Sequence, residues 1–133
     1  MIVDTSAIVA IVLGEPGSDD LVRAVLADPH PRMSAATFVE LAAVAAQRTA
    51  PEQRRRFESL LDRLGIEVVA MTPEHARIAA DAYRDFGEGS GHAARLNLGD
   101  CFSYALASAE DAPLLHVGDD FRHTDIRTAS PPA

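Results

Sequence analysis

The first six residues, Met1-Ile2-Val3-Asp4-Thr5-Ser6, constrain the fold more than any other stretch of the chain. A short apolar run ends in an aspartate, two hydroxyl residues follow, and a second apolar run begins at Ala7. This pattern is typical of a buried strand that ends at Asp4 and leads directly into a helix. In open α/β sheets, ligands bind in the crevice beyond the carboxyl ends of the strands. We therefore expect Asp4 at a binding edge.

Strand-like runs and helical patterns alternate along the rest of the chain. Helices are expected at residues 7–13, 18–27, 35–46, 51–64, 73–86 and 101–109, and further strands at 66–71 and 113–117. Ser18 is expected to cap the second helix, whereas residues 32–33 are too few to predict a strand. The alternation predicts one α/β domain over residues 1–133, a parallel sheet flanked by helices, with a loose tail from residue 129.

The helix at residues 35–46 contains one charged residue, Glu40, in an alanine-rich stretch that is apolar on nearly every side. Such a helix is expected to be buried. An ionised carboxylate in that setting costs several kcal/mol unless it is paired. Glu40 is therefore either half of a buried ion pair with an arginine, or a metal ligand or catalytic group.

Charge and composition exclude several functions. The net charge is −8 and all 12 basic residues are arginines, so the chain has no lysine for a P-loop, a Schiff base or aspartyl phosphorylation. Its overall field repels nucleic acid, so phosphates would need metal ions or a local arginine patch. The single cysteine, Cys101, excludes an internal disulfide and a thiolate zinc site. Without a membrane-spanning run or a signal-peptide pattern, we expect a cytoplasmic protein.

Five acids stand at unusual places. Asp4 and Asp100 could each simply cap a helix, and Asp119 and Asp120 could be ordinary turn residues. A parallel sheet, however, brings strand ends and helix starts to one edge, where these acids and Glu40 would meet. Such a cluster needs cations to stay ionised. Oxygen-only ligands suit Mg²⁺ or Mn²⁺, so the sequence predicts a divalent-metal site.

Four motifs occur in an order that resembles the VapC-type PIN-domain ribonucleases, the toxins of type II toxin–antitoxin pairs. They are Ile2–Ala7, Phe38–Leu41, Asn97–Cys101 and Gly118–Phe121. The resemblance covers essentially the whole chain and implies a three-layer α/β/α domain with a metal-dependent endoribonuclease site. It implies one or two Mg²⁺ ions, with Mn²⁺ as a substitute.

By position, the resemblance implies that Asp4, Glu40 and Asp100 are three acids of this site. Many relatives hold the fourth acid where this chain has Gly118, so Asp120 or Asp119 must serve, with Asp120 favoured. Thr5, Ser6 and Asn97 match polar residues that steady the acids or the metal, although Asn97 could be a plain turn residue.

The resemblance also implies partners. RNA is the substrate, and Arg95 and His92 beside the Asp100 loop are candidates to grip it, or are simply solvated loop residues. Relatives form homodimers and hetero-oligomers with a cognate VapB-type antitoxin that covers the groove. Residues 18–27 and 49–64 are candidate docking surfaces.

Two other functions remain open. A PIN-like module that binds without catalysis is supported by the displaced fourth acid. An aspartate-nucleophile phosphatase would need a second aspartate two residues after Asp4, where Ser6 stands, and usually a lysine, which the chain lacks.

Overall fold

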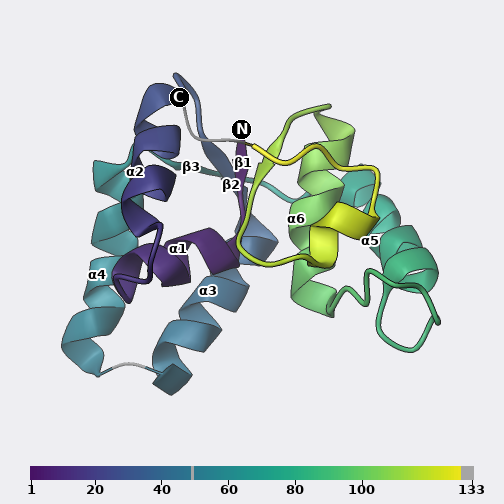
Figure 1. The fold of residues 1–133 in the computed structure, drawn as a ribbon, viewed down its shortest axis with the longest axis horizontal. Helices are drawn as coiled ribbons and strands as arrows, with labels where there is room; N and C mark the ends of the chain where they lie inside the picture. The colour runs from purple at the N-terminus through teal and green to yellow at the C-terminus, as the bar shows by residue number, and fades with distance from the viewer. Residues whose placement is uncertain (49, 130–133) are drawn as a thin grey trace.

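The computed structural model describes residues 1–48 and 50–129 of the chain. Within these residues, two α-helices lie between each pair of successive strands, which gives four short strands and six α-helices, and a 3-10 helix follows the last strand (Figure 1). In chain order the elements are β1 (Ile2–Val3), α1 (Thr5–Val12), α2 (Ser18–Ala27), β2 (Arg32–Ser34), α3 (Ala35–Arg48), α4 (Pro51–Arg63), β3 (Glu67–Val69), α5 (Pro73–Phe86), α6 (Leu98–Ala109), β4 (Leu114–Leu115) and η1 (Asp120–His123).

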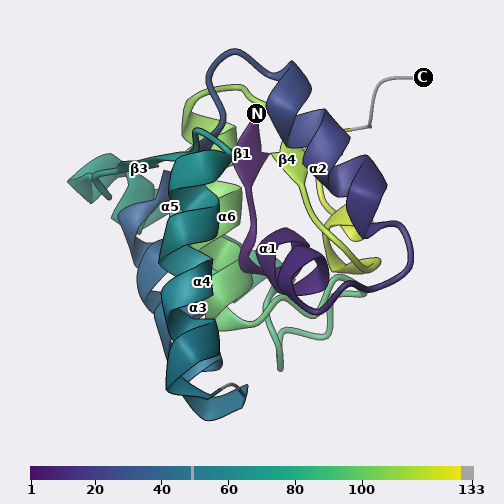
Figure 2. The same cartoon turned by 90° about the vertical axis from the view of Figure 1, so that its left-hand side faces the viewer.

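The strands form one parallel sheet in the order β3-β2-β1-β4. The sheet grows from β1 through β2 to β3, and the chain then returns to place β4 on the other side of β1. The strand order therefore reverses between β1 and β4, the point at which open α/β sheets bind ligands. Figure 2 shows β1 beside β4. Asp4 directly follows β1, and its backbone N–H donates to the Leu115 carbonyl at 3.0 Å.

Two apolar layers cover the two faces of the sheet, because strand side chains alternate between faces. Val3 and Leu115 belong to a core that is closed by α1, α2, α3 and α4. Ile2 and Leu114, their neighbours, belong to the opposite core with α5 and α6. Figure 1 shows these two groups of helices on either side of the strands. The predicted three-layer α/β/α fold is confirmed.

Most helices lie where the sequence pattern predicts them, with differences at their ends. The helix predicted at residues 51–64 ends at Arg63, and Gly65 follows with a φ of 68°. The second helix spans Ser18–Ala27, but its N-cap is Gly17. Gly17 adopts a φ of 87° and turns the chain into the helix one residue early. The prediction that Ser18 caps this helix was therefore wrong.

The strands are shorter than their apolar runs. The run at 66–71 supplies only Glu67–Val69, and the run at 113–117 supplies only Leu114–Leu115. Conversely, β2 forms although its residues alone are too few to predict a strand. It lies between two partners, with Arg32 N donating to Met1 O at 3.0 Å and Glu67 N to Pro31 O at 3.0 Å. Pairing with neighbours defines β2.

Helix α3 is buried along one face only. Thr37, Leu41 and Ala45 are buried, whereas Val39 is 65% exposed. The prediction of burial on nearly every side was therefore wrong. Alanine favours helix wherever it stands, so an alanine-rich sequence does not reveal which face meets the core.

At the C-terminal end, Ala129 N donates to Leu114 O at 2.8 Å and is thereby tied to β4. The rest of the predicted loose tail, residues 130–133, lies outside the described residues. Across the part of the chain that the structure describes, no helix has both the length and the apolar character needed to cross a membrane.

Candidate active site

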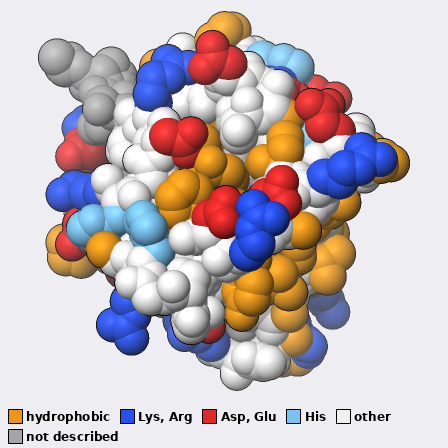
Figure 3. Space-filling view, turned by 90° about the vertical axis from the view of Figure 1, so that its right-hand side faces the viewer, with side chains coloured by type: hydrophobic (Ala, Val, Ile, Leu, Met, Phe, Trp, Pro, Cys, Tyr) orange, Lys and Arg blue, Asp and Glu red, His pale blue; other side chains and the backbone are white. Residues whose placement is uncertain are grey.

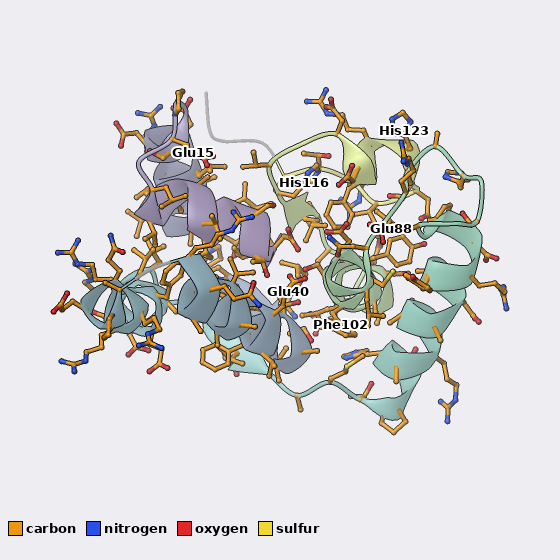
Figure 4. The ribbon with its side chains drawn as sticks, turned by 90° about the horizontal axis from the view of Figure 1, so that it is seen from below. Glu15, Glu40, Glu88, Phe102, His116 and His123 are labelled. Carbon is orange, nitrogen blue, oxygen red and sulfur yellow. The ribbon has the colours of Figure 1, made fainter. Side chains whose placement is uncertain are left out.

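A cleft of about 290 Å³ opens at the carboxyl edge of the sheet, beyond β1. The end of β1, α1, α3 and the start of α6 all contribute to its walls. Figure 4 shows Glu40 at the centre of the molecule in the view from below, between α3 and α6. The residues that line the cleft are Asp4, Thr5, Ser6, Val9, Glu15, Glu40, Val44, Arg48, Asn97, Asp100 and Val117.

Asp4 lies at the buried floor of this cleft, with 3% of its surface exposed. Its Oδ2 accepts hydrogen bonds from Ser6 N at 3.0 Å and Ser6 Oγ at 2.7 Å, so Asp4 caps α1. Its Oδ1 accepts from Ser103 Oγ at 2.5 Å. A carboxylate oxygen has two lone pairs. Both of those on Oδ2 are used by Ser6, whereas Oδ1 keeps one and can still bind a cation.

Glu40 projects from α3 toward the start of α6. Its Oε1 accepts from Thr5 Oγ1 at 2.6 Å, and the ion pairs found among the described residues do not include it. The expected alternative of a buried arginine pair is therefore absent from that part of the chain. Burial, and secondarily the charge of Asp4, raise the pKa of Glu40, although the Thr5 hydrogen bond opposes them.

Gly99 provides the space that the Glu40 carboxylate occupies. A Cβ at Gly99 would lie 1.2 Å from Glu40 Oε2 and 2.1 Å from its Cδ. Any other residue at position 99 would therefore displace Glu40 or move α6. The absence of a side chain here lets a carboxylate from α3 lie directly against the first turn of α6.

Asp100 is held in that first turn. Asn97 is the N-cap of α6, with its side chain accepting from Asp100 N at 2.8 Å, and the Asp100 carboxylate in return accepts from Asn97 N at 3.0 Å. Burial raises the pKa of Asp100 to about 7, and the charges of Asp4, Asp120 and Glu40 add to this rise. The negative charges of Asp4, Asp120 and Glu40 therefore act on Asp100. Asn97 acts as the N-cap of α6.

The two candidates for the fourth acid differ in their surroundings. Both are exposed near the start of η1, after Gly118, whose φ of 99° suits glycine. Asp119 forms an ion pair with Arg122 at 3.3 Å. Asp120 is among the charges that raise the pKa of Asp100. The charge of Asp120 therefore acts on Asp100, although neither Asp119 nor Asp120 is among the described residues that line the cleft. The role of Asp120 as the fourth acid stays a prediction.

Hydroxyl groups join the elements around the acids. Ser6 Oγ, which donates to Asp4, also accepts from Val117 N at 3.0 Å and so ties α1 to the segment after β4. Ser103 Oγ lies 3.2 Å from Thr37 Oγ1, so a buried hydroxyl pair links α6 to α3 behind Asp4. The hydroxyls of Thr5, Ser6 and Ser103 therefore donate to Glu40 and Asp4. That Thr5 and Ser6 steady a metal site stays a prediction.

The sequence pattern assigned no role to Ser103, Gly99 or Arg48, although each lies at the site. Ser103 follows Asp100 by three residues, a helical spacing that places both on one side of α6. Arg48 follows Glu40 by eight residues, or about two turns of α3, which likewise places both on one side of the helix. Gly99 has no comparable signal, because its role depends on a contact with a residue distant in sequence.

Arg95 and His92, the predicted RNA contacts, lie in the loop before α6. Neither is among the described residues that line the cleft. Arg95 is exposed with a φ of 51°. His92 packs its ring edge-on against Phe86, with centroids 4.9 Å apart. Their part in RNA binding stays a prediction.

The donor set suits a hard divalent cation, since Asp4, Glu40 and Asp100 offer carboxylate oxygens. A cation between them would relieve the repulsion that helps to raise the pKa of Asp100. Among the described residues, no three carboxylate, imidazole or thiol groups already lie close enough to hold one ion. An ion would therefore have to draw the acids toward a shared point.

Comparison with known proteins identifies the family of this chain. Residues 1–127 match the PIN domain family. Ribonuclease VapC42 of Mycobacterium tuberculosis is 58% identical over 129 residues, which cover 97% of this chain and 98% of that protein.

Two solved structures share the fold at low sequence identity. Mycobacterium tuberculosis VapC20, described as a toxin that cleaves the sarcin–ricin loop, gives a TM-score of 0.76 at 16% identity and covers 98% of both chains. A toxin–antitoxin complex from Klebsiella pneumoniae gives a TM-score of 0.71 at 16% identity, again over 98% of both chains. The near-complete family match and the 58% identical relative place the chain in the PIN domain family and, within it, among the VapC ribonucleases.

Proposed function

We propose that this chain, as one domain over residues 1–133, is a divalent-metal-dependent endoribonuclease and the toxin of a type II toxin–antitoxin pair. One observation carries the proposal. Carboxylates from the end of β1, from α3 and from the first turn of α6 line a single cleft where the strand order reverses. Asp4, Glu40 and Asp100 supply them, and Asp120 is proposed as the fourth acid.

The cleft supports hydrolysis of a phosphodiester. Asp4 and Asp100, with Glu40 and Asp120, would hold Mg²⁺ or Mn²⁺, which supplies a water of lowered pKa and neutralises the charge of the reacting phosphate. Ser6 and Ser103 fix the orientation of Asp4. Glu40 or one of the aspartates would accept the proton of the attacking water.

The proposed regulator is a VapB-type antitoxin, and the proposed assemblies are a homodimer and a toxin–antitoxin hetero-oligomer. The Klebsiella structure is a toxin–antitoxin complex. Exposed apolar side chains support a covering partner: Leu98 and Val117, next to or within the cleft lining, are 57% and 45% exposed. On α2, part of the predicted docking surface, Leu26 is 60% exposed. Thr49 of the other predicted surface lies outside the described residues.

The test is cleavage of structured RNA by the purified protein with Mg²⁺, with EDTA, and with Mg²⁺ restored in excess. Cleavage should require Mg²⁺, and Asp100→Asn should reduce it by at least about a hundredfold while the far-ultraviolet circular dichroism spectrum stays unchanged. Asp119→Asn and Asp120→Asn form a matched pair, in which only the second should lose activity. Undiminished cleavage in EDTA would reject the proposal.

A second candidate is a PIN-like module that binds but does not cleave. It is favoured by one observation, that no three potential ligands among the described residues are already close enough for one ion. A Mn²⁺ titration without binding near neutral pH, together with intact RNA binding, would support this candidate.

A further inference from the structure

We propose that Arg48 binds an RNA phosphate that lies next to the scissile phosphate along the strand. This assignment rests on the proposed function and concerns the same cleft. In a chain of net charge −8, it assigns to the positive group of the cleft lining a contact that would hold a polyanion near the acids.

Arg48 lies on the same stripe of α3 as Glu40. Glu40, Val44 and Arg48 are spaced by four residues, which places them on one face of the helix. All three line the cleft. Eight residues of α-helix extend about 12 Å, so Arg48 stands at the outer end of a wall that begins at the acids. A strand of RNA that follows this wall would pass Arg48.

The charges of the cleft distinguish Arg48 from its neighbours. Asp4, Glu40, Asp100 and Glu15 are the acids of the lining, and Arg48 is the one arginine among the described residues that line it. Figure 4 shows Glu15 near the connection between α1 and α2, away from Glu40. The cleft is thus negative at the end that would hold the cation, and its positive group is displaced along α3.

Arg48 also differs in its pairing from five arginines elsewhere on the molecule, and within the described residues it shares its unpaired state with Arg77, the control used below. The ion pairs among the described residues include Arg23, Arg32, Arg84, Arg122 and Arg127, whereas none of them includes Arg48. Its guanidinium therefore keeps its donors for a ligand, and it matches phosphate in a two-pronged geometry that Lys cannot reproduce.

The face on the α5 side of the molecule offers less to RNA. On the face formed by α5 and the C-terminal segment, acidic and basic side chains are interspersed among apolar patches (Figure 3). The arginine Arg84 of α5 is neutralised by Asp85 at 2.9 Å and Asp81 at 3.3 Å. This comparison favours the cleft wall as the RNA contact.

A simpler role for Arg48 is electrostatic support of its own helix, because a cation in the last turn interacts favourably with the helix dipole. Arg48→Lys separates the two roles. It keeps the charge at the end of α3 and removes the planar fork. The control is Arg77→Ala, which removes an exposed arginine of α5 that is absent from the cleft lining.

The experiment measures kcat and KM for cleavage of a structured RNA in Mg²⁺ over a series of salt concentrations. Arg48→Ala should raise KM about tenfold with kcat nearly unchanged, since one charge-assisted contact to a flanking phosphate is lost. The slope of log(kcat/KM) against log[salt] should become shallower by about 0.7, the value for one phosphate contact on a single strand. Arg48→Lys should recover part of the loss, and Arg77→Ala should match the unsubstituted protein.

Three results would overturn the assignment. The first is an unchanged KM and salt slope in Arg48→Ala. The second is an equal loss in Arg77→Ala, which would show a general charge effect. The third is unchanged RNA kinetics with weakened inhibition by the cognate antitoxin, which would place Arg48 on the protein interface. If the unsubstituted protein shows no Mg²⁺-dependent cleavage, the proposed function fails, and this assignment with it.

Discussion

At the scale of single residues, Asp4 shows that a helix cap and a candidate metal ligand can be the same carboxylate. One oxygen caps α1 through Ser6, and the other accepts from Ser103. These hydroxyl donors fix the orientation of a buried acid without neutralising it. The two interpretations of Asp4 from the sequence, a helix cap and a metal ligand, are therefore compatible.

Ser103→Ala tests whether this orientation matters for chemistry. Loss of the 2.5 Å hydrogen bond to Asp4 Oδ1 should reduce RNA cleavage by about 10- to 100-fold, as is typical for groups that orient a metal ligand. Ser59→Ala, an exposed serine of α4, is the matched control. Wild-type kcat/KM in Ser103→Ala would show that Asp4 needs no such support.

Gly99→Ala tests the contact between α6 and Glu40. Alanine normally stabilises a helix over glycine by about 0.5–1 kcal/mol, but here its Cβ would meet the Glu40 carboxylate. We expect reduced cleavage and no gain in the free energy of unfolding. In the Glu40→Ala background the clash is gone, so the same substitution should then stabilise the protein. Equal stability effects in both backgrounds would contradict this contact.

The raised pKa of Asp100 gives a pH dependence with a defined sign. The folded protein binds a proton at Asp100 up to about pH 7, whereas the unfolded chain releases it near the ordinary pKa of about 3.9. Stability from this group therefore falls as pH rises from about 4 to 7. In EDTA, Asp100→Asn should raise the melting temperature more at about pH 8 than at about pH 5. The same increase in melting temperature at both pH values would contradict the raised pKa of Asp100.

At the scale of elements, the first turn of α6 organises the site. It combines the Asn97 cap, the Gly99 gap and the Asp100 carboxylate within four residues. The sequence predicted a helix here but began it at residue 101, so that Asp100 could be read as the cap. The pairing of Asn97 and Asp100 moves the start to Leu98.

Substitution of Asn97 separates capping from a direct role in binding. Asn97→Ala should lower the free energy of unfolding by about 1 kcal/mol and reduce cleavage, because Asp100 loses its fixed position. Asn97→Ser keeps a capping oxygen and should restore most of the free energy of unfolding and most of the cleavage activity. Full stability with no cleavage in Asn97→Ser would instead indicate that the amide itself contacts metal or substrate.

Elements with signals in their own sequence were predicted closely, whereas elements that depend on neighbouring elements were not. Helices such as α5 carry their own signals, with Thr72 as the cap and Gly87 at the end, and were predicted closely. The strand β2 depends on its neighbours, and the exposed face of α3 depends on what packs against it. A local sequence pattern contains neither property. The strand β2 was therefore not predicted, and the prediction that α3 is buried on nearly every side was wrong.

At the scale of the whole molecule, topology explains why the acids could be predicted and their supports could not. Alternating strands and helices imply a parallel sheet, and a parallel sheet gathers strand ends and helix starts at one edge. That rule brings Asp4 and Asp100 together from the sequence alone. The contacts of Ser103 with Asp4 and of Gly99 with Glu40 join distant residues, and only the folded chain shows them.

Binding of Mn²⁺ shows whether the acids of this cleft form one divalent-cation site. A Mn²⁺ titration, followed by electron paramagnetic resonance near neutral pH, would compare the protein with Asp4→Asn, Glu40→Gln and Asp100→Asn. Glu88→Gln is the control, since Glu88 is exposed and is not among the described residues that line the cleft. We predict that each of the three substitutions weakens binding at least about tenfold and that Glu88→Gln does not. Equal affinity in all five proteins would contradict the account.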